Sequence, residues 1–215
     1  MPAERAPRSR PAPAPAKPSG FADAPPRAWQ RMLSGRRLDL LDPSPVDVEI
    51  EDIAHGLARV ARWNGQTVGA YAYSVAQHSL LVESLMRAER PALPRRWLLA
   101  GLLHDAPEYV IGDMISPFKA AIGGDYKRIE SALMRAIHIR FGLPAALPEE
   151  VEQRIKRADK VAAFTEAVDV AGFDEPEARR VLAYRRKARG PVQTPMPPEA
   201  AKDAFLARFG DLFVA

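Results

Sequence analysis

Apolar residues recur at the three- and four-residue spacing of an amphipathic helix along most of the chain, from about residue 49 onward. The first such stretch places Ile50, Ile53 and Leu57 on one face, and the second begins at Ser74, a residue type favoured at helix N-caps. No strand-like alternation is convincing, so the pattern predicts an all-α bundle. The helices are predicted at residues 49–63, 74–89, 94–106, 125–141 and 148–171, with two shorter ones near 176–188 and 198–209.

The part of the chain before residue 49 has a different composition. Residues 1–27 are rich in proline and alanine and have little apolar surface to bury, so we expect a disordered tail. A short extended segment follows at roughly 32–48, where Pro43 and Pro45 are incompatible with a regular helix or a central strand. The predicted organisation is therefore this tail followed by one helical domain, residues 28–215, which is long enough to bury a core.

The formal net charge of +4 is concentrated in the tail. Residues 1–27 carry five basic and two acidic side chains, which leaves the rest of the chain at about +1. A near-neutral domain argues against an extended surface for a nucleic-acid polymer. The absence of cysteine excludes a disulfide framework and a thiolate metal site. No apolar run approaches the roughly 18 residues of a membrane span, and no secretory signal is visible, so we expect a cytoplasmic protein without a membrane partner.

Two histidines and two aspartates lie in apolar, helical sequence, where each needs a partner. Taken alone, His78 is read as a buried core histidine and Asp159 as the ion-pair partner of a neighbouring lysine or arginine. Adjacent residues of a helix diverge by about 100°, but Pro107 predicts a bend at which His104 and Asp105 can converge. Taken together, two imidazoles and two carboxylates are the ligand types of a divalent metal ion.

These residues, in this order, resemble a known family. The order H…HD…D is that of the HD-domain metal-dependent phosphohydrolases, and the wider pattern is similar to their bacterial 5′-deoxyribonucleotidase branch. The HD dipeptide alone is a weak signal, whereas the ordered set over residues 50–170 is specific. The matching residues are Arg62-Trp63, His78-Ser79, His104-Asp105 with Glu108, Gly112-Asp113 with Pro117 and Lys119, and Ala158-Asp159-Lys160.

The resemblance implies a metal centre with catalytic carboxylates beside it. Glu108 is expected to orient or deprotonate the attacking water, or to protonate the leaving oxygen. Asp113 is expected to be a second acid near the sugar or the leaving group. The open positions of the metal would take water and a substrate oxygen. One divalent ion (Mn, Co, Mg, Fe or Zn) is expected to be held by four ligands: His78, His104, Asp105 and Asp159.

The resemblance also implies the residues that contact the substrate. Arg62 is expected to clamp the phosphate, Trp63 to pack against the sugar or base, and Lys119 is a weaker phosphate ligand. Gln77 departs from the pattern, because an acidic residue often precedes the first histidine, and this change bears on substrate choice. The remaining histidines, His55 and His138, fall outside the motif and are read as ordinary helix residues.

The resulting hypothesis is a phosphohydrolase that acts on a small nucleotide, expected to be a deoxyribonucleoside 5′-monophosphate. One alternative is a triphosphohydrolase that releases tripolyphosphate from a dNTP, which needs more basic residues around the pocket. A second is a metal-containing nucleotide-binding or regulatory module with little turnover, against which the intact Glu108 and Asp113 argue. A homodimer is implied only by the resemblance.

Overall fold

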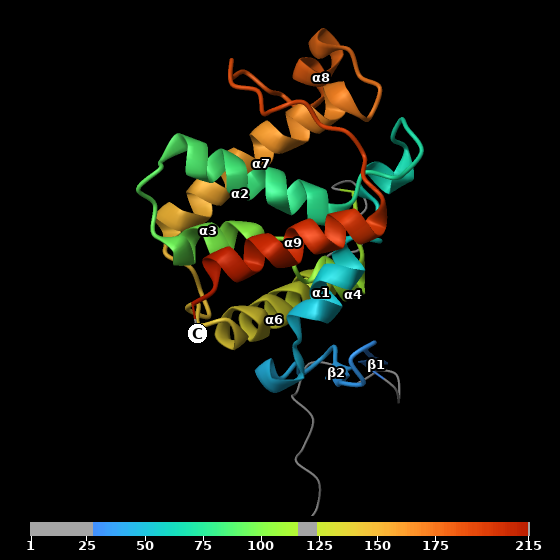
Figure 1. Cartoon of the computed structure of the whole chain (residues 1–215). Coiled ribbons are helices and arrows are strands. Elements are labelled where there is room, and N and C mark those ends of the chain that lie inside the picture. Colours follow the sequence, from blue (N-terminus) through green and yellow to red (C-terminus); the bar gives the residue numbers. More distant parts are fainter. Residues whose placement is uncertain (1–27, 116–123, 215) are drawn as a thin grey trace, which may run out of the picture.

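The structure is a computed structural model that describes residues 28–115 and 124–214 (Figure 1). It is mostly helical, as the periodicity predicted. The expected disordered tail (1–27) and Lys119 lie outside the described residues. Among the described residues, no helix is both long and apolar enough to cross a membrane. The helices are α1 (Ile50–Leu57), α2 (Val75–Glu89), α3 (Arg95–Leu102), α4 (Glu108–Ile111), α6 (Gly124–Arg140), α7 (Glu149–Asp169), α8 (Glu175–Val181) and α9 (Pro198–Leu212), with 3-10 turns at Pro45–Asp47 and Arg62–Gly65.

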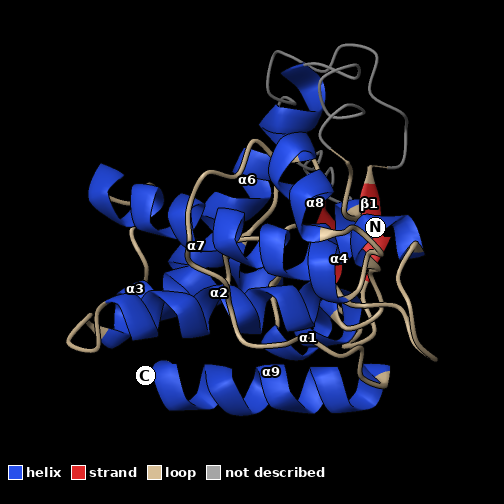
Figure 2. Ribbon diagram, turned by 90° about the horizontal axis from the view of Figure 1, so that it is seen from above, coloured by secondary structure: helices blue, strands red, loops and turns tan. Residues whose placement is uncertain are grey.

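Helix α2 lies at the centre of the bundle. It packs against α1, α3, α7 and α9. Figure 2 shows α9 on one side of the layer formed by α1, α2 and α3, with α6 and α7 on the other side. Leu81, Val82 and Met86 of α2 are buried, and each buried aliphatic side chain contributes roughly 1.5–3 kcal/mol. This apolar packing holds α2 in place. His78 lies on the same helix and is therefore fully buried in the middle of the domain.

The N-terminal part of the domain contains a hairpin that the sequence pattern did not predict. Strands β1 (Trp29–Arg31) and β2 (Arg37–Asp39) pair antiparallel, with Gln30 opposite Leu38. Each strand has three residues, too few for an alternation of apolar and polar positions to be recognised. The chain is therefore mostly, and not wholly, helical.

The chain bends at the HD dipeptide, as Pro107 predicted. Helix α3 ends at Leu102, residues 103–107 form a turn, and Pro107 precedes the first residue of α4. A close contact between α1 and α4 fixes the far side of this turn. A Cβ atom at Gly56 would lie 2.8 Å from the Cβ and the carbonyl oxygen of Tyr109. Only glycine allows this approach, which holds Glu108 next to the turn.

Candidate metal centre

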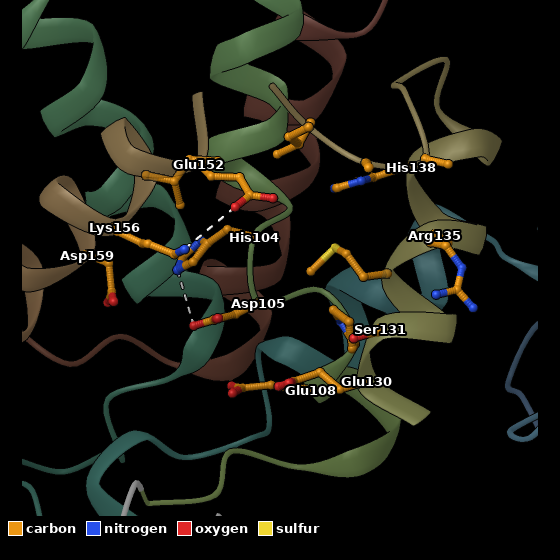
Figure 3. Close-up of a pocket in the computed structure, with 16 residues that line it drawn as sticks. His104, Asp105, Glu108, Glu130, Ser131, Arg135, His138, Glu152, Lys156 and Asp159 are labelled. Carbon is orange, nitrogen blue, oxygen red and sulfur yellow. Dashed lines mark ion pairs between the residues drawn. The ribbon is translucent and has the colours of Figure 1, made fainter. Parts of the chain in front are cut away.

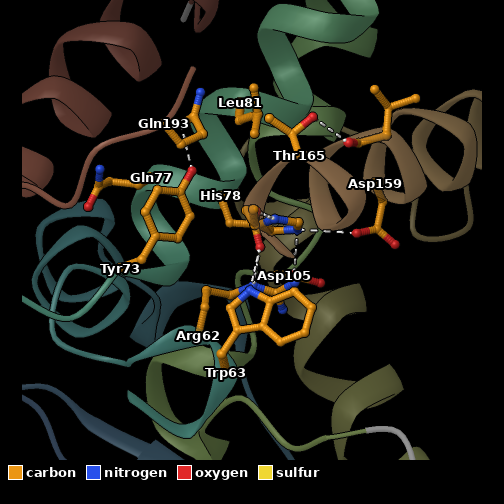
Figure 4. A network of polar contacts seen from close by, with 12 residues as sticks. Arg62, Trp63, Tyr73, Gln77, His78, Leu81, Asp105, Asp159, Thr165 and Gln193 are labelled. Atoms are coloured by element: carbon orange, nitrogen blue, oxygen red, sulfur yellow. Dashed lines mark hydrogen bonds and ion pairs between the residues drawn. The ribbon is translucent and has the colours of Figure 1, made fainter. Parts of the chain in front are cut away.

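The four predicted metal ligands meet where α2, α7 and the 103–107 turn approach one another (Figures 3 and 4). Nε2 of His78 lies 3.3 Å from Nε2 of His104, 3.4 Å from Oδ2 of Asp105 and 3.3 Å from Oδ1 of Asp159. Nε2 of His104 lies 3.2 Å from the same Asp105 oxygen. Residues that are far apart in the sequence are therefore neighbours around one buried imidazole nitrogen.

In both histidines, the Nδ1 nitrogen, which points away from the ligand group, makes a hydrogen bond. Nδ1 of His104 lies 2.8 Å from the carbonyl oxygen of Gly101, and Nδ1 of His78 lies 2.5 Å from Oε1 of Glu166. Both acceptors lack protons of their own, so Nδ1 of each ring is the donor. In the neutral rings, both Nε2 atoms then carry lone pairs, and these face each other. Two facing lone pairs need a cation between them, which is either a proton or a metal ion.

The separations fit the first coordination shell of a small divalent cation. His78, His104 and Asp105 offer ligand atoms that all lie within 4.8 Å of one another, and Asp159 adjoins His78. Ligands about 2.1 Å from a tetrahedral ion lie about 3.4 Å apart, and ligands about 2.3 Å from an octahedral ion lie about 3.2 Å apart. The contacts of 3.2–3.4 Å agree with both arrangements. The residues can therefore hold such an ion.

The electrostatics of the group also favour a cation. Burial lowers the pKa of His78, but Glu166 and Asp159 outweigh it and raise the pKa to about 10. Burial raises the pKa of Asp105, yet His104 and His78 bring it well below its usual range. The pKa of Asp159 is lowered as well, because its hydrogen bond with His78 outweighs its burial. Carboxylates that stay ionised and attract a proton to His78 equally attract a divalent ion in place of that proton.

Glu166 is a candidate site residue that was not predicted from the sequence. Its fully buried carboxylate accepts hydrogen bonds from Nδ1 of His78, from Nε1 of Trp63 at 3.1 Å and from Nε of Arg62 at 3.4 Å. Burial raises the pKa of Glu166, but His78 and Arg62 lower it below its ordinary value, so it is an anion. Such a carboxylate fixes the tautomer and orientation of a metal-binding histidine. The available signal was its position on α7, seven residues after Asp159, which places both on one helix face.

A cavity of about 540 Å³ adjoins the ligands (Figure 3). His104, Asp105 and Asp159 line one side, and residues of α6, His138 among them, line the other. Glu108, the predicted catalytic carboxylate, is only 3% exposed and lines the same cavity. The structure therefore brings together the predicted ligands, the predicted proton-transfer residue and a space for a small molecule.

Arg62, Trp63 and Asp113 lie beside the metal ligands, but none of them is among the described residues that line this cavity. Nη1 of Arg62 donates to Oδ2 of Asp113 at 3.0 Å. Burial lowers the pKa of Arg62, but the negative charges of Glu166 and Asp113 outweigh this effect and raise the pKa above its ordinary value. Trp63 and Asn64 have left-handed backbone conformations, with φ of 55° and 50°; asparagine adopts this region readily, whereas it is uncommon for a residue as bulky as tryptophan. This backbone directs Arg62 and Trp63 to Glu166, and their predicted contacts with substrate remain predictions.

Gln77 is buried and contacts the segment that leads to α9. Its Nε2 donates to the carbonyl oxygen of Thr194 at 2.9 Å, and its Oε1 accepts from the amide of Met196 at 3.0 Å. Both ends of the amide group thus hold a backbone segment, a task that an acidic side chain could not perform because it lacks a donor. The predicted contact between Gln77 and the substrate remains a prediction.

The comparison with known proteins places the chain among bacterial relatives. No protein-family model matches it. An uncharacterized protein of Rhodobacter capsulatus is 60% identical over 184 residues, which cover 85% of this chain and 94% of the relative. The uncharacterized protein YfdR of Escherichia coli is 32% identical over 166 residues, which cover 77% of this chain and 85% of YfdR. The chain belongs to the YfdR family. Neither relative's name states an activity, so the function of this YfdR-family protein has to be argued from its metal centre and cavity.

Replacing Glu166 by glutamine is expected to weaken divalent metal binding by about 10–100-fold, because supporting carboxylates of this kind contribute that much to affinity. Glutamine keeps the size of the side chain but removes the anion that fixes the Nδ1 proton of His78. Titration of the purified protein with Mn²⁺ or Zn²⁺ measures the effect. Glu83→Gln is a matched control, because Glu83 is equally a buried carboxylate and pairs with Arg208 away from the site. If both variants lose the same affinity, Glu166 has no special role.

Proposed function

We propose that this YfdR-family protein is a metal-dependent phosphohydrolase of the HD type, and that it removes phosphate from a deoxyribonucleoside 5′-monophosphate. The observation that carries the proposal is the convergence of two imidazole Nε2 acceptors with Asp105 at the wall of a cavity that also contains buried Glu108. The ordered motif that resembles HD phosphohydrolases supports the same reaction class. A divalent metal with nitrogen and oxygen ligands beside a buried carboxylate is suited to hydrolysis.

His78, His104, Asp105 and Asp159 would hold the ion, and a divalent ion bound there would supply Lewis-acid chemistry to a phosphoryl oxygen and to water. Glu108 accepts the proton of the attacking water or returns a proton to the nucleoside oxygen as the phosphorus–oxygen bond breaks. Glu166 keeps the proton on Nδ1 of His78, so that Nε2 remains an electron-pair donor.

Arg62 is proposed to stabilise the negative charge that develops on the phosphoryl group. Its guanidinium is held by Asp113 and Glu166, and the charges of Asp105 and Glu108 also act on it. A guanidinium fixed in this way presents its remaining N–H groups in a rigid fork that suits phosphate oxygens. Asp113 is then proposed to orient Arg62 in addition to its expected role near the sugar or leaving group.

The charge of the cavity favours a monophosphate over a triphosphate. Its described lining contains two cationic side chains, Arg135 and Lys156, and five carboxylates: Asp105, Glu108, Glu130, Glu152 and Asp159. A divalent ion leaves this lining with a small net negative charge, which repels a triphosphate, with its additional β- and γ-phosphate charges, more strongly than a monophosphate. Like charges brought together at a binding site cost several kcal/mol. We therefore expect kcat/KM for dNMPs to exceed that for dNTPs by at least about tenfold.

Phosphate release from dNMPs, NMPs and dNTPs, each with Mn²⁺, Co²⁺ or Mg²⁺ and after chelation, tests the proposal. Inorganic phosphate from dNMPs, lost on chelation and restored by metal, is the expected result. Tripolyphosphate from dNTPs, with dNMPs inert, would replace the proposal with the triphosphohydrolase alternative. Bound metal with no turnover on any nucleotide would overturn the nucleotidase and leave the binding module as the alternative.

A further inference from the structure

His138 is a buried histidine that the metal centre does not use. It lies on α6 and is 4% exposed, and it lines the cavity across from the metal ligands (Figure 3). Neither of its ring nitrogens makes a hydrogen bond of ordinary length and angle among the described residues, and only the backbone of Pro144 and Ala145 acts on the ring as a hydrogen-bond partner would. His138 could not be singled out from its sequence neighbours, because the cavity forms only where residues 145–147 face α6 and α7.

The surroundings of His138 favour the neutral form of its ring. Burial lowers the pKa of His138, although the backbone carbonyls of Pro144 and Ala145 and the charge of Glu152 act in the opposite direction. A neutral imidazole has one N–H donor and one acceptor nitrogen. A buried polar group without hydrogen bonds lowers stability, and a phenylalanine or leucine at this position would avoid that cost. The histidine is therefore better explained by a ligand that hydrogen-bonds with it.

The wall around His138 suits a flat, uncharged ring. Met134, one helical turn before His138, lines the cavity together with Leu147 and Ile155. A methionine thioether adapts its shape and makes favourable contacts with aromatic rings. Two carboxylates, Glu130 and Glu152, and two cations, Arg135 and Lys156, also line the cavity, and Lys156 is paired with Glu152. The charges at this end are therefore balanced, which favours an uncharged part of the substrate there over its phosphate.

We propose that His138, Met134 and Leu147 form the subsite for the heterocyclic base of the substrate, with the imidazole hydrogen-bonded to the donor and acceptor groups on the edge of the base. This inference rests on the proposed nucleotidase function and names the part of the substrate that this side of the cavity recognises. The phosphate would then lie at the metal ligands and the base at α6, so the cavity would be occupied from one side to the other.

The test compares hydrolysis of dNMPs with that of deoxyribose 5-phosphate, which has the same phosphate ester and no base. His138→Phe keeps a planar ring without hydrogen bonds, and it is expected to reduce the preference for dNMPs by about tenfold, through KM, because one lost hydrogen bond is of that size. His138→Gln, which keeps a donor and an acceptor, should restore most of the preference. His55→Phe, on α1, is the matched control. A preference unchanged in His138→Phe, or no preference in the wild type, would overturn the subsite.

Calorimetric titration with deoxynucleosides separates a failure of the subsite from a failure of the proposed function. If the wild type hydrolyses neither substrate, the phosphohydrolase proposal fails, but the subsite still predicts nucleoside binding that His138→Phe weakens. Absence of nucleoside binding to the wild type would refute the subsite. The melting temperature is a further readout, because His138→Phe removes a buried group without hydrogen bonds and should unfold no earlier than the wild type. A lower melting temperature would indicate a structural role for the imidazole.

Discussion

Replacing His104 by alanine is expected to abolish divalent metal binding and phosphate release while the helical fold is retained. Nε2 of His104 is one of the two imidazole nitrogens proposed to donate an electron pair to the ion. It lies 3.2 Å from Oδ2 of Asp105, so the substitution removes one ligand from the compact group of His78, His104 and Asp105. The structural cost is small, because the side chain lies in the turn after α3. Its hydrogen bond with the carbonyl oxygen of Gly101 contributes only about 0.5–1.5 kcal/mol.

Metal content after purification, measured by atomic emission, and the far-ultraviolet circular dichroism spectrum check this prediction together. His55→Ala removes an imidazole from α1, outside the site, and should leave both metal content and activity at wild-type levels. A His104→Ala protein that still binds one ion per chain and still hydrolyses dNMPs would show that the histidines are structural. A variant that unfolds would be replaced by His104→Gln, which keeps more of the packing volume.

The grouping of the four candidate metal ligands could be predicted from the sequence because their order resembles that of a known family, although each residue taken alone had an ordinary structural explanation. His78 and Asp159 are polar residues on apolar faces of helices, and His104 and Asp105 precede a proline that ends the helical run. In the structure, Nε2 of His78 lies within 3.4 Å of each of the other three residues, and Nε2 of His104 lies 3.2 Å from Asp105. Periodicity likewise predicted α2, α6 and α7, because long amphipathic helices repeat their apolar residues many times.

The residues that surround and orient the candidate ligands could not be predicted from the sequence, because their roles depend on contacts between distant segments. The role proposed for Glu166 depends on its hydrogen bonds with Arg62 and Trp63, which lie about one hundred positions earlier in the chain. These two residues reach Glu166 from a segment with an unusual left-handed backbone. A glutamate seven residues after Asp159 is by itself unremarkable on a long helix. The same limit applies to His138, whose burial is set by a loop, and to the β1–β2 hairpin, whose strands are too short to show a period.

The distribution of charge explains why Glu108 is the residue on which hydrolysis should depend. The pKa values of Asp105 and Asp159 are lowered by the histidines, so both carboxylates are acceptors of positive charge and poor carriers of a proton. Glu108 lines the same cavity, is buried and lies outside the ligand group, so it is the carboxyl group placed to act as a general acid or base. The proposed function therefore divides metal binding and proton transfer between different carboxylates.

Glu108→Gln is accordingly expected to lower kcat for dNMP hydrolysis by about 10²–10⁴-fold, the usual contribution of a positioned general acid or base. Metal affinity should stay within a few-fold of the wild type, because Glu108 is outside the ligand group. Glu130→Gln is the matched control: it makes the same change of charge in the lining of the same cavity, and it should alter kcat by a few-fold at most. The pH profile of kcat should lose one limb in Glu108→Gln alone. If Glu108→Gln and Glu130→Gln are equally impaired, the loss reflects the charge of the cavity, and proton transfer has to be assigned to another residue.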